Sequence, residues 1–100
     1  MLRFEWDPAK ARSNQRKHGV SFEDAMHVFL DPFALSEQDR VEDGELRWQT
    51  IGLAGGIVLL LVAHTVGDKD GDEIIRLVSA RRATGKECLR YEQSRPQDIG

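Results

Sequence analysis

Three arginines near the C-terminal end of the chain have a spacing that suits phosphate chemistry. Arg76 lies inside an apolar stretch, and Arg81 and Arg82 follow that stretch directly. Thr84 and Glu87 then form a capping box that begins a helix. The free N–H groups at a helix start favour an anion, and guanidinium groups bind phosphate through two parallel hydrogen bonds. We interpret this stretch as a candidate phosphate site; the alternative is that the arginines are solvated or paired with carboxylates.

Two histidines could transfer protons near such a site. His64 ends an apolar run and falls nearly opposite Arg76 if residues 68–71 turn a hairpin. Because strand residues alternate between faces, a slip of one residue would separate the two. A histidine beside a cation suits general acid–base catalysis, and a structural strand-end histidine is an equal alternative. Lys17 and His18 end a predicted helix, where they either extend a basic face or only complement the helix dipole.

The other reactive residue types do not indicate metal, cofactor or thiol chemistry. The three histidines and Cys88 lack metal-ligand spacing, so we expect neither a metal site nor a cofactor. The glycines match neither a P-loop nor a dinucleotide-binding fingerprint. Cys88 is expected in the core, and Tyr91 is expected to pack its helix rather than stack on a base.

Charge is segregated along the chain, although the net charge is only −3. Residues 1–20 carry five Lys or Arg against two acids, residues 21–45 carry eight acids against Arg40, and residues 78–91 are basic again. If folding brings the two basic ends together, an electropositive face results that attracts phosphates. Solvated helix faces are the alternative.

Length and composition predict one globular domain over residues 1–100. A single cysteine cannot form an internal disulfide, and the first residues lack the pattern of a signal peptide. The longest apolar run, residues 57–63, is too short to span a bilayer. We therefore expect a soluble cytoplasmic protein without a membrane partner.

Hydrophobic periodicity predicts an α+β domain with the element order β-α-α-β-β-β-β-α. Strands are expected at 2–6, 33–37, 46–53, 57–65 and 74–80, a polar loop at 38–45, and helices at 8–18, 22–30 and 85–93. The four- or five-stranded sheet should be mainly antiparallel. We expect its two N-terminal helices and one C-terminal helix to lie together on one face.

The chain resembles the BrnT toxins of type II toxin–antitoxin systems over about residues 4 to 92. The resemblance lies, in order, in FEWDPAKARSNQRKHGVSFEDAMHVFLDP, RWQTIG, VAHT and IIRLVSARRATGKECLRYE. It implies a RelE-like fold and a metal-independent ribonuclease that inhibits translation. It also implies a BrnA-like antitoxin as partner, with DNA contacted only indirectly through that antitoxin. Whether the RNA is free or on the ribosome stays open.

The resemblance also implies roles for the residues above. In RNA cleavage without a metal, the 2′-hydroxyl attacks the adjacent phosphate, cations stabilise the transition state and an acid protonates the leaving 5′-oxygen. The implied catalytic residues are Arg76, Arg81 and His64. The implied RNA-binding residues are Lys17, His18 and Arg82, and His18 is the other candidate for the acid or base. Two alternatives lack catalysis: a degenerate toxin-like module that binds its antitoxin and takes part in operon autoregulation, and a plain RNA-binding domain.

Overall fold

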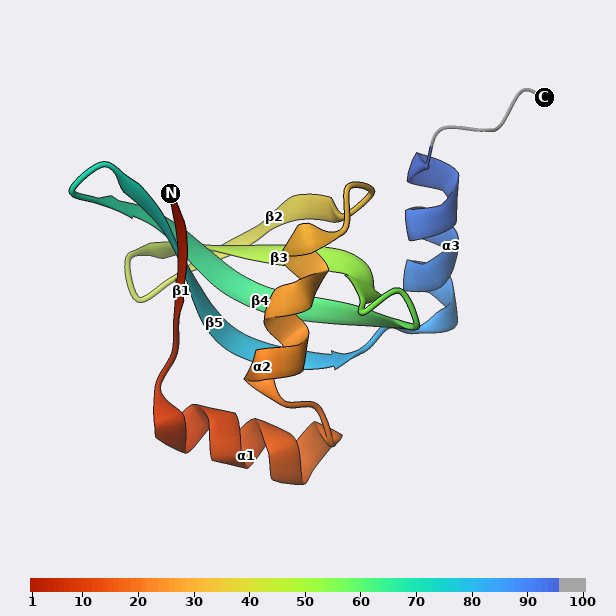
Figure 1. The fold of residues 1–100 in the computed structure, drawn as a ribbon, viewed down its shortest axis with the longest axis horizontal. Helices are drawn as coiled ribbons and strands as arrows, with labels where there is room; N and C mark the ends of the chain where they lie inside the picture. Colours follow the sequence, from red (N-terminus) through yellow and green to blue (C-terminus); the bar gives the residue numbers. More distant parts are fainter. Residues whose placement is uncertain (96–100) are drawn as a thin grey trace.

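We describe residues 1–95 of a computed structural model of the chain (Figure 1). The elements, in chain order, are β1 (Leu2–Glu5), α1 (Pro8–His18), α2 (Phe22–Ala25), the 3₁₀ helix η1 (Met26–Leu30), β2 (Leu35–Glu42), β3 (Glu45–Ala54), β4 (Val58–Lys69), β5 (Asp72–Arg82) and α3 (Gly85–Ser94). This order confirms the predicted α+β class.

The sheet has five strands in the order β1-β5-β4-β3-β2. β1 pairs in parallel with β5, and the other three pairings are antiparallel, as expected for a mainly antiparallel sheet. Because β1 and β2 form opposite edges, the segment between them crosses the sheet. That crossing segment contains α1, α2 and η1, and Figure 1 shows α2 lying over the strands.

Both ends of α1 follow the predicted capping pattern. The Asp7 carboxylate accepts a hydrogen bond from the Ala9 N–H at 2.9 Å, and Pro8 occupies the first helical position. Gly19 ends the helix with φ 69°, the left-handed conformation that glycine adopts without strain. The start and stop signals in the sequence therefore placed this helix correctly.

Only the first part of the helix predicted for residues 22–30 is an α-helix. α2 ends at Ala25, and the chain continues as η1. η1 packs directly on β3 at Gly52, where an added Cβ would lie 2.8 Å from the Val28 side chain. 3₁₀ turns are frequent at the C-termini of α-helices, and the residue before Pro32 leaves the helical region as expected.

The prediction of a polar loop at residues 38–45 is wrong. β2 extends to Glu42, pairs with β3, and turns back through Asp43 and Gly44, both at positive φ. β2 is an edge strand that is exposed along most of its length, so its residues carry no alternation of apolar and polar types. Charges on such a strand protect its free edge from pairing with other chains.

The two faces of the sheet are covered differently. Phe22 and Val28, from α2 and η1, pack with Leu60 of β4 on one face, the helix face. Leu61, the next residue of β4, points the other way and packs with Tyr91 of α3. The helices therefore do not all lie on one face. α3 covers one end of the opposite face, and we call the rest of that face the open face.

Candidate functional site

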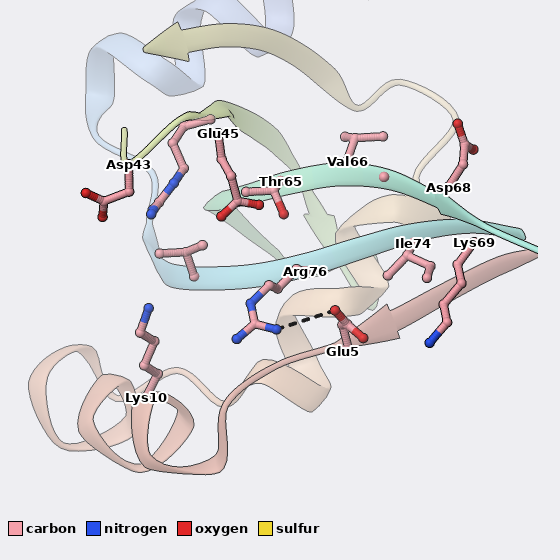
Figure 2. A pocket seen from close by; sticks show the side chains of 13 residues that line it. Glu5, Lys10, Asp43, Glu45, Thr65, Val66, Asp68, Lys69, Ile74 and Arg76 are labelled. Carbon is pink, nitrogen blue, oxygen red and sulfur yellow. Dashed lines mark hydrogen bonds and ion pairs between the residues drawn. The ribbon is translucent and has the colours of Figure 1, made fainter. Parts of the chain in front are cut away.

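A cleft of about 530 Å³ lies on the open face, where strands from three parts of the sequence approach α1 (Figure 2). Its charged lining residues are Glu5, Lys10, Asp43, Glu45, Arg47, Asp68, Lys69 and Arg76. The lining is therefore mixed in sign, with cations contributed by α1, β3, β4 and β5.

Arg76 points into this cleft from β5. Its guanidinium lies 3.4 Å from the Glu5 carboxylate, and the Arg76 side chain is 47% exposed. Charge-assisted hydrogen bonds between such groups usually measure about 2.7–2.9 Å, and exposed ion pairs contribute about 0–1 kcal/mol. The pairing with Glu5 is therefore weak enough for an anionic ligand to replace it.

A second, smaller cleft of about 230 Å³ adjoins the first along α1. Lys10 and Val78 line both clefts, and Lys17 and His18 line the second. We call the combined depression the α1–β5 groove. It brings together three of the residues predicted from the sequence: Arg76, Lys17 and His18.

Lys10 was missed in the sequence analysis, although the sequence contains a signal for it. Lys10 and Lys17 are seven residues apart, with Asn14 between them, so all three lie on one side of α1. Figure 2 shows Lys10 pointing from α1 towards the strands. Within residues 1–95, no salt bridge joins either lysine to a carboxylate. Both ammonium groups are available to a ligand.

Asn14 holds α1 beside β5 and so positions the groove. Its side-chain amide donates to the carbonyls of Val20 and Ala80, both at 2.9 Å, and its oxygen accepts from the Ala80 N–H at 3.0 Å. β1 pairs only with the first part of β5, up to Arg76. Asn14 therefore supplies the hydrogen-bond partners of the β5 backbone at Ala80, beyond the end of β1.

The turn between β4 and β5 places His64 and Arg76 on opposite faces. Lys69 pairs with Asp72, so the turn is formed by Asp70 and Gly71. In the register that follows, His64 is opposite Leu77 and Arg76 is opposite Thr65. The predicted pairing was therefore off by one residue, which places His64 on the helix face and Arg76 on the open face. Beyond these pairs Ala63 is opposite Ser79, so Val78 is an extra residue that forms a bulge in β5.

The same bulge reverses the strand alternation beyond it. Uninterrupted strand alternation would place Ala80 on the same side as Arg76, but Ala80 is fully buried in the core of the helix face. An extra residue shifts the two-residue period by one, so every side chain after Val78 changes face.

His64 is a core residue in this structure. It is 2% exposed, its Nε2 lies 2.7 Å from the Thr50 hydroxyl, and its Nδ1 lies 3.4 Å from the Thr65 carbonyl. Phe29 packs edge-on against the His64 ring, with the ring centroids 4.9 Å apart. The Thr50 hydroxyl is also hydrogen-bonded to the Ser36 hydroxyl, at 2.7 Å. Burial lowers the pKa of His64. His64 lines neither part of the groove.

Acid is expected to destabilise the fold through His64. Its folded-state pKa lies below the ordinary 6.5, so its contribution to stability is complete above pH 6.5 and is lost as pH falls below that value. Urea unfolding of the wild type and His64→Gln at about pH 7.5 and about pH 5.5 measures this contribution. The variant keeps the other two histidines, so an equal loss of stability in both proteins would contradict the expectation.

Arg81 is engaged by α3. Two of its guanidinium nitrogens donate to the two Glu87 carboxylate oxygens at 2.8 and 3.0 Å. This bidentate pair raises the pKa of Arg81 and lowers the pKa of Glu87 to about 2. Glu87 also accepts from the Thr84 N–H and completes the capping box. Arg81 therefore ties the end of β5 to α3.

Arg82 lies apart from the α1–β5 groove. It is opposite Leu60 in the sheet register and, with Asp24 and Val58, lines a pocket of about 150 Å³ on the helix face. Because consecutive strand residues point to opposite faces, the structure does not bring Arg82 together with Arg76 and Arg81.

Tyr91 packs its helix, as the sequence analysis expected. It is buried, and its hydroxyl donates to the Asp31 carboxylate at 2.6 Å. Burial, and then Asp31, raise the pKa of Tyr91 to about 12. Burial also raises the pKa of Asp31, but hydrogen bonds from Leu53, Tyr91 and Phe33 outweigh that effect and leave the pKa lowered. Asp31 thus joins the end of η1 to β3 and α3.

Comparison with known proteins identifies the family of the chain. The family model described as "Ribonuclease toxin, BrnT, of type II toxin-antitoxin system" matches residues 6–87. The chain belongs to the BrnT family. No curated protein matches it.

One similar solved structure is the 1.1 Å crystal structure of the Brucella abortus ribonuclease toxin BrnT. It matches this BrnT-family chain with a TM-score of 0.60 at 22% identity, over 84% of this chain and 99% of the Brucella chain. At that identity the likeness establishes a shared fold, and the site must be argued from the residues of this chain.

Two further features concern metals and membranes. Among residues 1–95, no three His, Cys, Asp or Glu side chains lie together as a metal-binding group. None of the helices in this range is long and apolar enough to cross a bilayer.

Proposed function

We propose that this BrnT-family chain is the toxin of a type II toxin–antitoxin pair, an endoribonuclease that cleaves RNA without a metal ion and so inhibits translation. A BrnA-like antitoxin would neutralise it. The observation that carries the proposal is the α1–β5 groove, which is lined by Arg76, Lys10, Lys17 and His18. A polyanionic strand is the ligand that such a group of cations suits.

The groove residues can divide the steps of RNA cleavage between them. The 2′-oxygen loses its proton to solvent and attacks the adjacent phosphorus, which forms a cyclic phosphate and breaks the bond to the 5′-oxygen. Arg76 stabilises the extra negative charge on the phosphate oxygens through its guanidinium. Lys10 and Lys17 bind the flanking backbone, and His18 donates a proton to the leaving 5′-oxygen.

This assignment narrows the set of residues named from the sequence. His18 is preferred over His64 as the acid because His64 is buried with both ring nitrogens near core partners. Arg76 is preferred over Arg81 because Glu87 occupies the Arg81 guanidinium. The role proposed for Arg81 is to support α3.

The test is RNA cleavage by the purified chain in EDTA, together with its expression without an antitoxin. We expect RNA degradation, growth arrest, and a loss of cleavage in His18→Gln of about a hundredfold or more. His27→Gln is the matched control, because His27 is an exposed histidine on η1 outside the groove. RNA that stays intact in EDTA would contradict the proposal.

The acidic rim of the cleft favours a second candidate function. Glu5, Asp43, Glu45 and Asp68 line it beside the cations and reduce its positive potential. That second function is a degenerate toxin that binds its antitoxin and takes part in operon autoregulation. RNA binding separates the two functions: a nuclease should show a salt dependence with a slope of about −0.7 per neutralised phosphate, and a flat salt response would favour the antitoxin-binding module.

A further inference from the structure

Arg47 is a cation of the cleft that the sequence analysis did not single out. It lies on β3, its side chain is only 17% exposed, and it lines the 530 Å³ cleft across from α1. Its Nε is buried and has no hydrogen-bond partner among residues 1–95. The nearest carboxylate oxygen in a salt bridge, from Glu42, is 3.9 Å from its NH1.

The surroundings of Arg47 differ from those of Arg81, which is also partly buried. Arg81 has two carboxylate contacts at 2.8 and 3.0 Å, whereas Arg47 has one distant contact and an unsatisfied nitrogen. Removing a guanidinium from water without supplying hydrogen-bond acceptors is unfavourable. The buried Nε is not accessible from the cleft, so an anion there would be bound by the terminal guanidinium nitrogens of Arg47, whose salt bridge to Glu42 is long at 3.9 Å.

The sheet register places Arg47 and Arg76 on either side of Thr65. Thr65 is the register partner of Arg76, and His64 is the partner of Trp48, the residue after Arg47. Continuing that register brings Arg47 opposite Thr65, so the three residues form a row across β3, β4 and β5. All three line the same cleft.

We propose that Arg47 binds a second phosphate of the RNA backbone, on the far side of Thr65 from the phosphate held by Arg76. The strand would then run from α1 across β5 and β4 to β3 on the open face. This inference rests on the proposed function, because it extends the RNA path of the α1–β5 groove.

The experiment measures binding of a 2′-O-methyl RNA oligonucleotide, which keeps the phosphates but lacks the attacking hydroxyl and so cannot be cleaved. Arg47→Gln is expected to raise the Kd by about tenfold or more and to reduce the salt slope by about 0.7. Arg40→Gln is the matched control, because Arg40 also pairs with Glu42, at 3.3 Å, but is 68% exposed and does not line the cleft. Its Kd should equal that of the wild type.

Two further variants keep the test decisive if Arg47→Gln does not fold. Arg47→Lys keeps the charge but not the planar fork, so it should retain the salt slope with an intermediate Kd. Glu42→Gln removes the competing carboxylate and should tighten binding several-fold. An unchanged Kd in a folded Arg47→Gln, or in Glu42→Gln when Arg47→Gln is unfolded, overturns the proposal.

The outcomes for Arg47 and for the nuclease can be told apart. A wild type that binds the 2′-O-methyl strand but leaves ordinary RNA intact contradicts the nuclease and preserves the role of Arg47 as a phosphate contact. If the wild type cleaves RNA and Arg47→Gln binds the 2′-O-methyl strand as tightly as the wild type does, only the role proposed for Arg47 is contradicted. A wild type that does not bind the 2′-O-methyl strand overturns the role of Arg47, whatever its cleavage activity.

Discussion

Arg76→Gln is expected to slow RNA cleavage by about two to three orders of magnitude, the loss typical when one preorganised donor to a developing negative charge is removed. β5 directs the Arg76 guanidinium into the cleft. Because its pairing with Glu5 is weak, the N–H groups of Arg76 can bind phosphate instead. Glutamine keeps the polar character and much of the length of the side chain but removes the charge. The measurement is the single-turnover cleavage rate of a defined RNA.

Stability measurements separate a loss of chemistry from a loss of structure. Arg76 and Glu5 are both about half exposed, so their pair should contribute at most about 1 kcal/mol, and the variant should unfold near the wild-type midpoint. Arg12→Gln is the control, because Arg12 is an exposed arginine on α1 that lines neither part of the groove. Cleavage by Arg76→Gln at the wild-type rate would refute the assignment.

Asn14→Ala is expected to lower the free energy of unfolding by about 3 kcal/mol or more. The substitution removes three hydrogen bonds and leaves buried backbone groups of Val20 and Ala80 without partners. Each unsatisfied buried group is unfavourable by about 1–3 kcal/mol. Urea unfolding at constant pH gives the difference directly.

A neighbouring position on the same helix provides the comparison for Asn14. Gln15 is exposed, so Gln15→Ala should leave stability within about 0.5 kcal/mol. Because Asn14 also fixes α1, which carries Lys10, Lys17 and His18, the folded fraction of Asn14→Ala should cleave RNA more slowly. Equal unfolding free energies for the two variants would show that the Asn14 contacts contribute little.

The local signals in the sequence predicted most of the fold. Asp7, Pro8 and Gly19 bound α1 as expected, and the Thr84–Glu87 capping box begins α3. These signals work because the groups that satisfy a helix end lie within a few residues of it. The edge strand β2 had no such signal, since neither of its faces is buried along most of its length.

The site was predicted less well because it depends on register and on contacts between distant residues. The β4–β5 turn is formed by Asp70 and Gly71, which shifts the pairing by one residue from the predicted register and places His64 and Arg76 on opposite faces. The extra residue at Val78 then changes the face of the residues that follow it, and a bulge of this kind has no marker in a single sequence. The capping box predicted one role of Glu87, but its pairing with Arg81 depends on how α3 lies over the sheet. The buried environment of Arg47 likewise depends on neighbours from other elements.

The parallel pairing of β1 with β5 has a consequence for how the molecule is assembled during synthesis. β1 has its sheet partner at residues 73–76, and Asn14 is bonded to a residue 66 positions later. Contacts so far apart in the chain form slowly and only after the later segment exists. A nascent chain that lacks β5 therefore has Lys10 but nothing for α1 to dock against. The groove is therefore completed only after β5 has emerged from the ribosome.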